Sequence, residues 1–474
     1  MKTRTEHDSL GTVEIPAEAY WGATTQRALE CFPISGLRHH PVFIDAYTML
    51  KLAAAEANRR CGVLEPRLAD AIVRACHEIL DGKWRDQFVV DVFQMGAGTS
   101  IHMNVNEVLA NRANELLGGA IGTYDPVSPN DHVNFGQSTN DTFPTAMRLA
   151  ILLLLRDHLH EPLVQMEKAF LAKGTEFDAV VKSGRTHLQD AVPIRLGQEF
   201  RAYGEALRKC HASIAHARKG LCALGIGGSA AGTGLNTAPG YRDAVIEELK
   251  NLSGIRDLEA STDMREAMQS QRPVAEISAA LRNLALELGR IANDLRLLAS
   301  GPATGLAEIV LPAVAPGSSI MPGKVNPSML ECTNMVCFEV IGNDTAVAWA
   351  VGAGQLELNV MMPLMQHKVL TSIHVLGTMT RELTNRCIRG IEANEPRCRR
   401  YAESSMGLAT ALNTHIGYHE AGRVAKKALA EGRTLLDIVR EEKLLSDDDL
   451  ARALDPAILT EPGIPGKTRK ERKT

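Results

Sequence analysis

Four short polar segments of the sequence carry side chains that could bind a carboxylate group. They are rich in Gly, Ser, Thr and Asn, and most lie just before a helical pattern: residues 96–100, 137–141, 184–190 and 317–327. Free backbone N–H groups and the positive end of the helix dipole make such helix starts favourable for anions. Each segment taken singly is better explained as an ordinary helix cap. Together the four segments indicate a helical protein that binds an anion.

Long amphipathic helices must position these segments. Two stretches repeat apolar residues at alternating steps of four and three, which places one apolar stripe along each helix. The first stripe comprises Leu196, Phe200, Tyr203, Leu207, Cys210, Ile214, Ala217 and Leu221. The second comprises Ile277, Leu281, Leu284, Leu288, Ile291, Leu295 and Leu298. Helices of this length with narrow stripes are typical of bundles. Three further helices are predicted in residues 144–173, 329–351 and 367–391. Pro162 is expected to bend the first of them.

The predicted fold class is all-α, with three parts along the chain. Residues 1–137 form a mostly helical first domain, residues 138–392 form the long central bundle, and residues 393–474 form a small helical domain with a basic tail. Aromatic residues make up only 4% of the chain. This scarcity favours helices packed by aliphatic side chains over a β-sandwich.

The composition excludes several classes of protein. The 474 residues carry a net charge of -4, which gives no electrostatic case for binding nucleic acid or an anionic membrane. Nine cysteines at irregular spacing indicate reduced thiols rather than disulfides or a metal site. Residues 1–16 contain no apolar signal segment, and the longest aliphatic run, residues 149–155, is too short to span a bilayer. We therefore expect a cytoplasmic protein with neither a membrane nor a nucleic acid as partner.

The segment at residues 317–327, GSSIMPGKVNP, closely resembles the signature loop of the fumarase/aspartase superfamily. The similarity extends over nearly the whole chain and includes residues 232–236, 342–344 and 411–418. The resemblance implies a three-domain, nearly all-α chain with a long central five-helix bundle. It also implies a homotetramer in which segments from three subunits meet at each active site.

Within the superfamily, the sequence is most similar to aspartases and next to class II fumarases. Residues 96–100, 128–134, 191–193 and 358–361 resemble aspartases, whereas residues 20–22 and 413–415 resemble fumarases. The first group includes residues expected to touch substrate, so the resemblance implies a carbon–nitrogen lyase that converts the small dicarboxylate L-aspartate to fumarate and ammonia. Three alternatives stay open: interconversion of fumarate and L-malate, cleavage of an N-substituted aspartate, and a non-catalytic helical scaffold.

The same resemblance implies a role for each candidate site residue. Ser318 is the base that removes the proton next to the β-carboxylate, as an alkoxide stabilised by the backbone N–H groups from Ser318 to Met321 and by Lys324. Glu331 pairs with His187 and sets its charge. The remaining contacts are to substrate: Thr99, Ser100, Thr139 and Ser319 at the β-carboxylate, Lys324 and Asn326 at the α-carboxylate, and Ser138, Asn140, His187 and Thr186 at the amino group. No metal ligands and no required cofactor are expected, and activation by a divalent cation is left open.

Four positions depart from the pattern of the superfamily. His102 and Ala303 replace a usual Asn and a usual Arg, Gly136 replaces a common Ser, and Met362 replaces a Glu common in aspartases. None of these changes removes a proposed catalytic group. His102 and Gly136 could reshape the pocket for the leaving group, which is why cleavage of an N-substituted aspartate stays among the alternatives.

Overall fold

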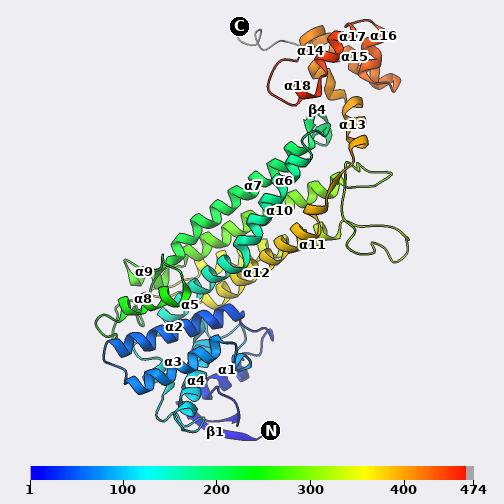
Figure 1. Ribbon diagram of the computed structural model, residues 1–474. Helices are drawn as coiled ribbons and strands as arrows, with labels where there is room; N and C mark the ends of the chain where they lie inside the picture. The colour runs from blue at the N-terminus through cyan, green and yellow to red at the C-terminus, as the bar shows by residue number, and fades with distance from the viewer. Residues whose placement is uncertain (1, 466–474) are drawn as a thin grey trace. The chain divides into compact units, whose positions relative to one another are not determined.

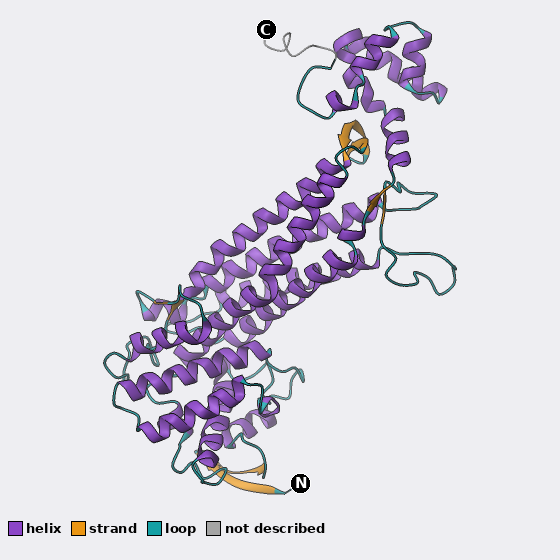
Figure 2. Ribbon diagram, in the orientation of Figure 1, coloured by secondary structure: helices purple, strands orange, loops and turns teal. Residues whose placement is uncertain are grey.

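The computed structural model describes residues 2–465, and helices make up most of it, as the sequence predicts (Figures 1 and 2). The predicted basic tail at residues 466–474 lies outside the described residues. The chain divides into two compact units. The first comprises residues 1–161, 210–286 and 336–378, and the second comprises residues 162–209, 287–335 and 379–474. The predicted division into three domains at residues 137 and 392 stays a prediction.

The first unit begins with a small antiparallel sheet in which β1 (Thr3–Asp8) pairs with β2 (Gly11–Pro16). Its helices are α1 (Ala23–Cys31), α2 (Pro41–Arg60), α3 (Pro66–Leu80), α4 (Thr99–Leu116), α5 (Thr139–Leu154), α8 (Tyr241–Ser253) and α9 (Met264–Gln269). Helix α2 lies at the centre of this group, because it packs against α3, α5 and α8 (Figure 1). A short parallel pair, β5 (Ala223–Leu224) and β6 (Glu259–Ala260), completes the unit.

Four long helices are α7 (Leu196–Ala217), α10 (Arg272–Leu298), α11 (Ser328–Gly352) and α12 (Met362–Arg386). Every residue of the two predicted apolar stripes is buried, which confirms the periodicity as a packing signal. The predicted helix at residues 144–173 is divided instead. It comprises α5, a wider π-helical turn (Leu155–His160) and α6 (Glu161–Glu176). Pro162 is the second residue of α6, shortly after the π-helical turn, and its lack of an N–H group removes one helical hydrogen bond there.

The second unit contains a hairpin of β3 (Val181–Thr186) and β4 (Gln189–Arg195), and a second short pair of β7 (Ile309–Val310) and β8 (Glu392–Ala393). Its last helices are α13 (Glu395–Ser404), α14 (Ala409–Ile416), α15 (Tyr418–Glu431), α16 (Leu435–Glu441), α17 (Asp447–Ala453) and α18 (Pro456–Leu459). Leu412, Val424 and Ile438 are fully buried and form the core of these helices. In the part of the chain that the structure describes, every helix is too short or too polar to cross a membrane.

Candidate active site

The starts of α4 and α5 bring two of the four polar segments together. Thr99 is the first residue of α4, and the preceding Gly98 has a left-handed backbone with φ of 87°. A Cβ atom at Gly98 would lie 2.2 Å from the ring of Phe143 in the first turns of α5, so the glycine permits this close approach. Ser100 is only 1% exposed, and its hydroxyl has no hydrogen-bond partner among residues 2–465. A buried hydroxyl without a partner is what a site for a polar ligand requires.

The start of α5 is a capping box. The Ser138 hydroxyl accepts from the N–H of Asn140 at 3.2 Å, and the Asp141 carboxylate accepts from the N–H of Ser138 at 2.9 Å. Asp141 also accepts from the N–H groups of Gly227 and Ser229, at 3.1 and 3.0 Å. Burial raises the pKa of Asp141 to about 6, and these three N–H groups oppose that rise. The glycine-rich loop at residues 225–230 therefore fixes the start of α5.

A buried polar network that the sequence analysis did not identify lies behind these two helix starts. Lys51 of α2 is fully buried, and its Nζ lies 2.9 Å from His102 Nε2, 3.1 Å from Asn134 Oδ1 and 2.9 Å from Gln137 Oε1. His102 Nδ1 lies 2.6 Å from the hydroxyl of Thr139, the first residue of α5. The sequence signal that could have indicated this network is a single lysine, Lys51, within the apolar sequence MLKLAAA at residues 49–55.

The electrostatics of this network follow from its burial. Burial lowers the pKa of Lys51 to about 7, although the neighbouring charge of Asp141 acts in the opposite direction. Burial also lowers the pKa of His102 well below its ordinary value, and the charge of Lys51 adds to that effect. His102 is therefore a neutral imidazole at physiological pH. The network places a lysine behind the N-termini of two helices that favour anions.

The loop that resembles the superfamily signature connects β7 to α11 and holds Ser318. The Ser318 hydroxyl accepts from the backbone N–H of Ile320 at 3.2 Å and from that of Met321 at 2.8 Å. Gly317 closes the loop, because its N–H donates to the carbonyl of Lys324 at 2.9 Å and a Cβ there would lie 2.4 Å from the same oxygen. The loop therefore aims two N–H groups at the oxygen of Ser318.

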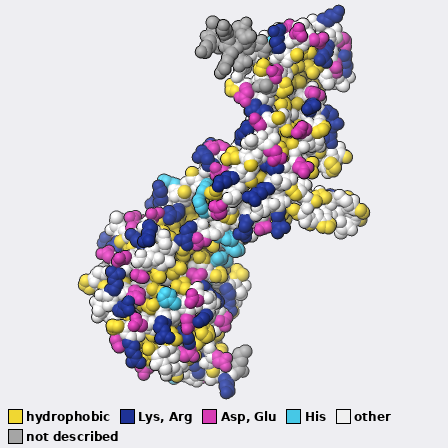
Figure 3. All heavy atoms as spheres, viewed as in Figure 1, with side chains coloured by type: hydrophobic (Ala, Val, Ile, Leu, Met, Phe, Trp, Pro, Cys, Tyr) yellow, Lys and Arg dark blue, Asp and Glu magenta, His cyan; other side chains and the backbone are white. Residues whose placement is uncertain are grey.

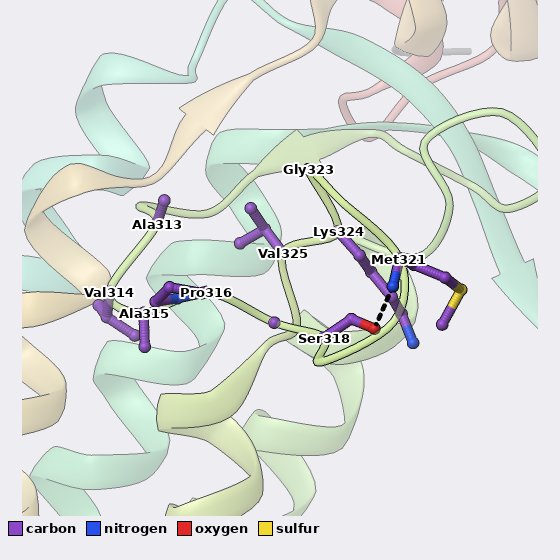
Figure 4. A pocket seen from close by; sticks show the side chains of 10 residues that line it. Ala313, Val314, Ala315, Pro316, Ser318, Met321, Gly323, Lys324 and Val325 are labelled. Atoms are coloured by element: carbon purple, nitrogen blue, oxygen red, sulfur yellow. Dashed lines mark hydrogen bonds between the residues drawn. The ribbon is translucent and has the colours of Figure 1, made fainter.

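Ser318, Met321 and Lys324 line one hollow of about 400 Å³ (Figure 4). Figure 4 shows the hydrogen bond between Ser318 and Met321 inside the loop. Asn326 holds the far side of the loop, because its side chain donates to the carbonyl of Gly317 at 2.5 Å. Residues 319–325 are exposed, which distinguishes this loop from the buried helix starts.

Thr186 and His187 lie at the tip of the β3–β4 hairpin and are exposed. His187 and Leu188 form its two-residue turn with positive φ of 55° and 59°, an unusual conformation for side chains larger than glycine. Such strain is kept at a position where the side chain is needed. Arg185 anchors the hairpin through the fully buried Glu308, with both carboxylate oxygens within 3.0 Å of its Nη1.

The candidate residues fall into two groups. Thr99, Ser100, Ser138, Thr139 and Asn140 gather at the helix starts of the first unit, and the other candidates belong to the second unit. Glu331 lies in the first turn of α11 and is partly buried. Within residues 2–465 of one chain, no ion pair joins it to His187, so their predicted pairing stays a prediction.

Three of the four unusual residues have a clear structural place, and only His102 belongs to the polar network. Gly136 has φ of 68°, and a Cβ there would lie 3.3 Å from the carbonyl of Asn236. Met362 is fully buried at the first position of α12. Ala303 is exposed in the turn at residues 301–305, where nothing in the structure explains its identity.

Comparison with known proteins relates this geometry to a family. The chain matches the family described as lyase over residues 11–342, and the family described as fumarase C C-terminus over residues 408–461. An aspartate ammonia-lyase of a Bacillus species is 47% identical over 98% of this chain and 99% of that protein. A class II fumarate hydratase of Thermosynechococcus vestitus is also 47% identical, over 95% of this chain and 96% of that protein.

A solved structure has the same fold. It is a fumarate lyase:delta crystallin from Brucella melitensis bound to cobalt, with a TM-score of 0.94 and 48% sequence identity. The match covers 97% of this chain and 100% of that chain. The likeness therefore extends through both units rather than through one segment.

Proposed function

The chain belongs to the fumarase/aspartase superfamily of lyases, and on this premise we propose that it eliminates ammonia from L-aspartate to give fumarate. This activity makes it a carbon–nitrogen lyase that acts on a small dicarboxylate. The full-length similarity to an aspartate ammonia-lyase is the observation that carries the proposal. The arrangement of Ser318 between two backbone N–H groups supports the chemistry.

Ser318 removes the proton from the carbon next to the β-carboxylate. A free serine is far too weak an acid to act as a base, so its alkoxide needs donors that stabilise the charge. The N–H groups of Ile320 and Met321 supply two such donors, and Lys324 lines the same hollow. Preorganised donors of this kind typically contribute about 3–4 kcal/mol each to stabilising an oxyanion.

The intermediate is an aci-carboxylate, which carries two negative charges on the β-carboxylate. Thr99, Ser100 and Thr139 at the helix starts, together with Ser319 of the Ser318 loop, hold this group. The unpartnered hydroxyl of Ser100 and the N-termini of α4 and α5 support this role, because both favour an anion. Lys324 and Asn326 hold the α-carboxylate.

The leaving amino group meets a third set of side chains: Ser138, Asn140, Thr186 and His187. In this proposal His187 is oriented by Glu331, and its exposed place at the tip of a strained turn supports a role outside its own chain. Expulsion of ammonia from Cα then completes the double bond of fumarate. The proton removed by Ser318 and the amino group lost from Cα account for both products.

The site is shared between subunits of a homotetramer, with three chains contributing to each site. Helix α11 supports this arrangement, because Met335, Phe338 and Trp349 are 67%, 64% and 80% exposed. Large exposed apolar side chains on one helix mark a surface that another chain covers. On the face in Figure 3, hydrophobic side chains lie exposed among charges of both signs. Equilibrium sedimentation gives a tetramer under this proposal, and a stable monomer contradicts it.

We propose that the reaction requires no cofactor, because its groups are hydroxyls, amides, a lysine and the single pair of His187 and Glu331, rather than the larger carboxylate and imidazole clusters that hold metals. Activity retained after exhaustive dialysis against a chelator supports this, and activity restored only by a divalent cation contradicts it. We also propose a cytoplasmic protein. The sequence supports this proposal, because its nine cysteines lie at irregular spacing, a pattern of reduced thiols rather than of a disulfide framework. Cell fractionation is the direct check.

The experiment that tests the proposed function follows fumarate by its ultraviolet absorbance. Purified protein is given L-aspartate or L-malate in parallel, and ammonia is assayed in the same samples. Fumarate and ammonia in equal amounts from L-aspartate, with none from L-malate, supports the ammonia-lyase. The absence of fumarate from both substrates contradicts the proposed activity.

A class II fumarase is the second candidate, because the fumarate hydratase relative is as similar in sequence as the aspartate ammonia-lyase. The same base and carboxylate contacts serve both reactions, so only the leaving-group pocket distinguishes them. Fumarate from L-malate alone selects this candidate. Turnover of an N-substituted aspartate, with neither simple substrate used, points instead to a pocket reshaped by His102 and Gly136.

A further inference from the structure

Lys51 has the hydrogen-bonding environment of a charged ammonium, the form that predominates below its lowered pKa of about 7. An ammonium has three hydrogens to donate and cannot accept. The three nearby polar atoms are His102 Nε2 and the side-chain oxygens of Asn134 and Gln137, all within 3.1 Å of Nζ. The Gln137 and Asn134 amide groups each donate elsewhere, to backbone carbonyls of residues 133, 135 and 137, which fixes their oxygens toward Lys51. The network is therefore complete only if His102 Nε2 also accepts.

The role of Lys51 as donor determines the tautomer of His102. A neutral imidazole carries one hydrogen, so an accepting Nε2 leaves that hydrogen on Nδ1. His102 Nδ1 lies 2.6 Å from Thr139 Oγ1, and therefore donates to it. The ring is held in place by stacking on Tyr47, with centroids 5.7 Å apart. His102 is 2% exposed, so water does not offer an alternative partner.

The direction of these hydrogen bonds decides what Thr139 can do. A hydroxyl has one hydrogen, and its oxygen can accept a hydrogen bond while that hydrogen is donated elsewhere. With Nδ1–H as its donor on the buried side, Thr139 keeps its own hydrogen for an acceptor at the start of α5. The opposite tautomer would turn the Thr139 hydrogen inward, toward the bare Nδ1, and leave the anion without this donor.

We propose that Lys51 and His102 are positioning residues that set the Thr139 hydroxyl as a donor to the substrate carboxylate. The inference rests on the proposed function, since it assigns the dicarboxylate as the acceptor. It also gives a physical reason for His102 where the superfamily usually has Asn. An Asn amide can donate to Thr139 just as an imidazole Nδ1–H does.

A pair of variants with the same shape tests the direction of donation. In His102→Asn the amide can still donate to Thr139, whereas in His102→Asp the carboxylate can only accept from it. Succinate serves as the binding probe, measured by calorimetry, and kcat/KM for L-aspartate is measured in parallel. We expect His102→Asn to stay within about fivefold of the parent and His102→Asp to lose on the order of 100-fold in kcat/KM, with weaker succinate binding. Equal succinate affinity and equal kcat/KM in the two variants overturn the proposal.

A double-mutant cycle with Lys51→Met separates positioning from a purely structural role. Without the lysine, the tautomer of His102 is no longer fixed, so Lys51→Met alone lowers kcat/KM. In the His102→Asn background the amide donor remains, so the same change lowers kcat/KM much less. A Lys51→Met effect of equal size in both backgrounds means that Lys51 only supports the fold, which overturns its positioning role. The cycle also serves if His102→Asp fails to fold.

Binding and turnover distinguish the failure of this inference from the failure of the proposed function. Succinate binding requires no reaction, so a difference between the His102 variants supports the positioning role even if L-aspartate is not a substrate. If the parent turns over L-aspartate while the two variants bind succinate equally well, the proposed function is retained and the positioning role is overturned.

Discussion

The helix starts of the first unit and the Ser318 loop of the second hold their polar groups in opposite ways. At the helix starts, Lys51 and His102 are buried and bonded to neighbouring side chains. In the Ser318 loop, residues 319–325 are exposed, and Ser318 and Gly317 bond within the loop. Packing therefore fixes the side chains of the first region before any ligand binds. The second region is held by hydrogen bonds within its own loop and stays exposed to solvent. Substitutions that disturb packing should therefore lower stability more in the first region than in the second.

The largest effect is expected for Ser318→Ala. Loss of the base should lower kcat for L-aspartate by on the order of 10³-fold or more. The melting temperature should not change, because the lost hydrogen bonds lie in an exposed loop where water replaces them. Ser404→Ala is a matched control, since Ser404 is an exposed serine that bonds only within α13. Unchanged activity in Ser318→Ala would mean that Ser318 is not the base.

Ser100→Ala tests the buried region with a smaller effect. Its hydroxyl is unpartnered, so we expect a loss of about 10²-fold in kcat/KM with no loss of stability. Ser278→Ala is the matched control, because the Ser278 hydroxyl is buried and donates to Asp344 at 2.7 Å. That control should lower the free energy of unfolding by about 1.5–3 kcal/mol and leave kcat unchanged. A destabilised Ser100→Ala with full activity would mean that the hydroxyl is structural.

Substitution of one glycine in each region compares how closely the two regions are packed. Gly98→Ala should destabilise the protein by about 3 kcal/mol, because its positive φ and the ring of Phe143 at 2.2 Å both oppose a Cβ. Gly323→Ala in the Ser318 loop has a similar φ of 81° but no atom within 4 Å. It should lower the free energy of unfolding by only about 1–2 kcal/mol. Thermal and denaturant unfolding measure both variants, and equal losses would mean that the helix starts are not close-packed.

The pH dependence of stability tests the burial of Lys51 in the parent protein. Burial lowers the folded-state pKa of Lys51 to about 7, below the ordinary value of 10.5, so the unfolded chain binds more protons between these values. The free energy of unfolding of the parent should therefore rise with pH across that window, by at most about 1.4 kcal/mol per pH unit. The groups that face Lys51 are His102, Asp141 and Cys76. Lys51→Met should show a flatter profile, and parallel profiles would mean that the pKa of Lys51 is not lowered.

Much of the fold could be predicted from the sequence because apolar periodicity reports burial directly. All fifteen positions of the two stripes are buried, from Leu196 to Leu298. The predicted helix begins too late, at Pro144. The helix begins at Thr139 instead, where the capping box of Ser138 and Asp141 starts it. The sequence analysis interprets residues 137–141 as a possible helix cap, but it does not join them to that helix.

The candidate site could be predicted only in part. The richness of residues 317–327 in Gly, Ser and Asn indicates a polar segment, and only its resemblance to the superfamily signature points to Ser318. In the structure, Ser318 accepts from two backbone N–H groups of this loop. Lys51 was missed because it lies on α2, more than fifty residues from His102, and no local pattern links them. Networks between distant helices depend on packing, which a single sequence does not reveal.

The central claim is that the buried helix starts of one chain and the exposed Ser318 loop of another act in one active site. Mixing Ser318→Ala with Ser100→Ala under conditions that allow subunits to exchange tests it most directly. The account predicts that fumarate formation from L-aspartate recovers to about one quarter of the parent rate, because each of two required copies is native in half of the positions. Activity that never exceeds the mean of the two separate variants would contradict it.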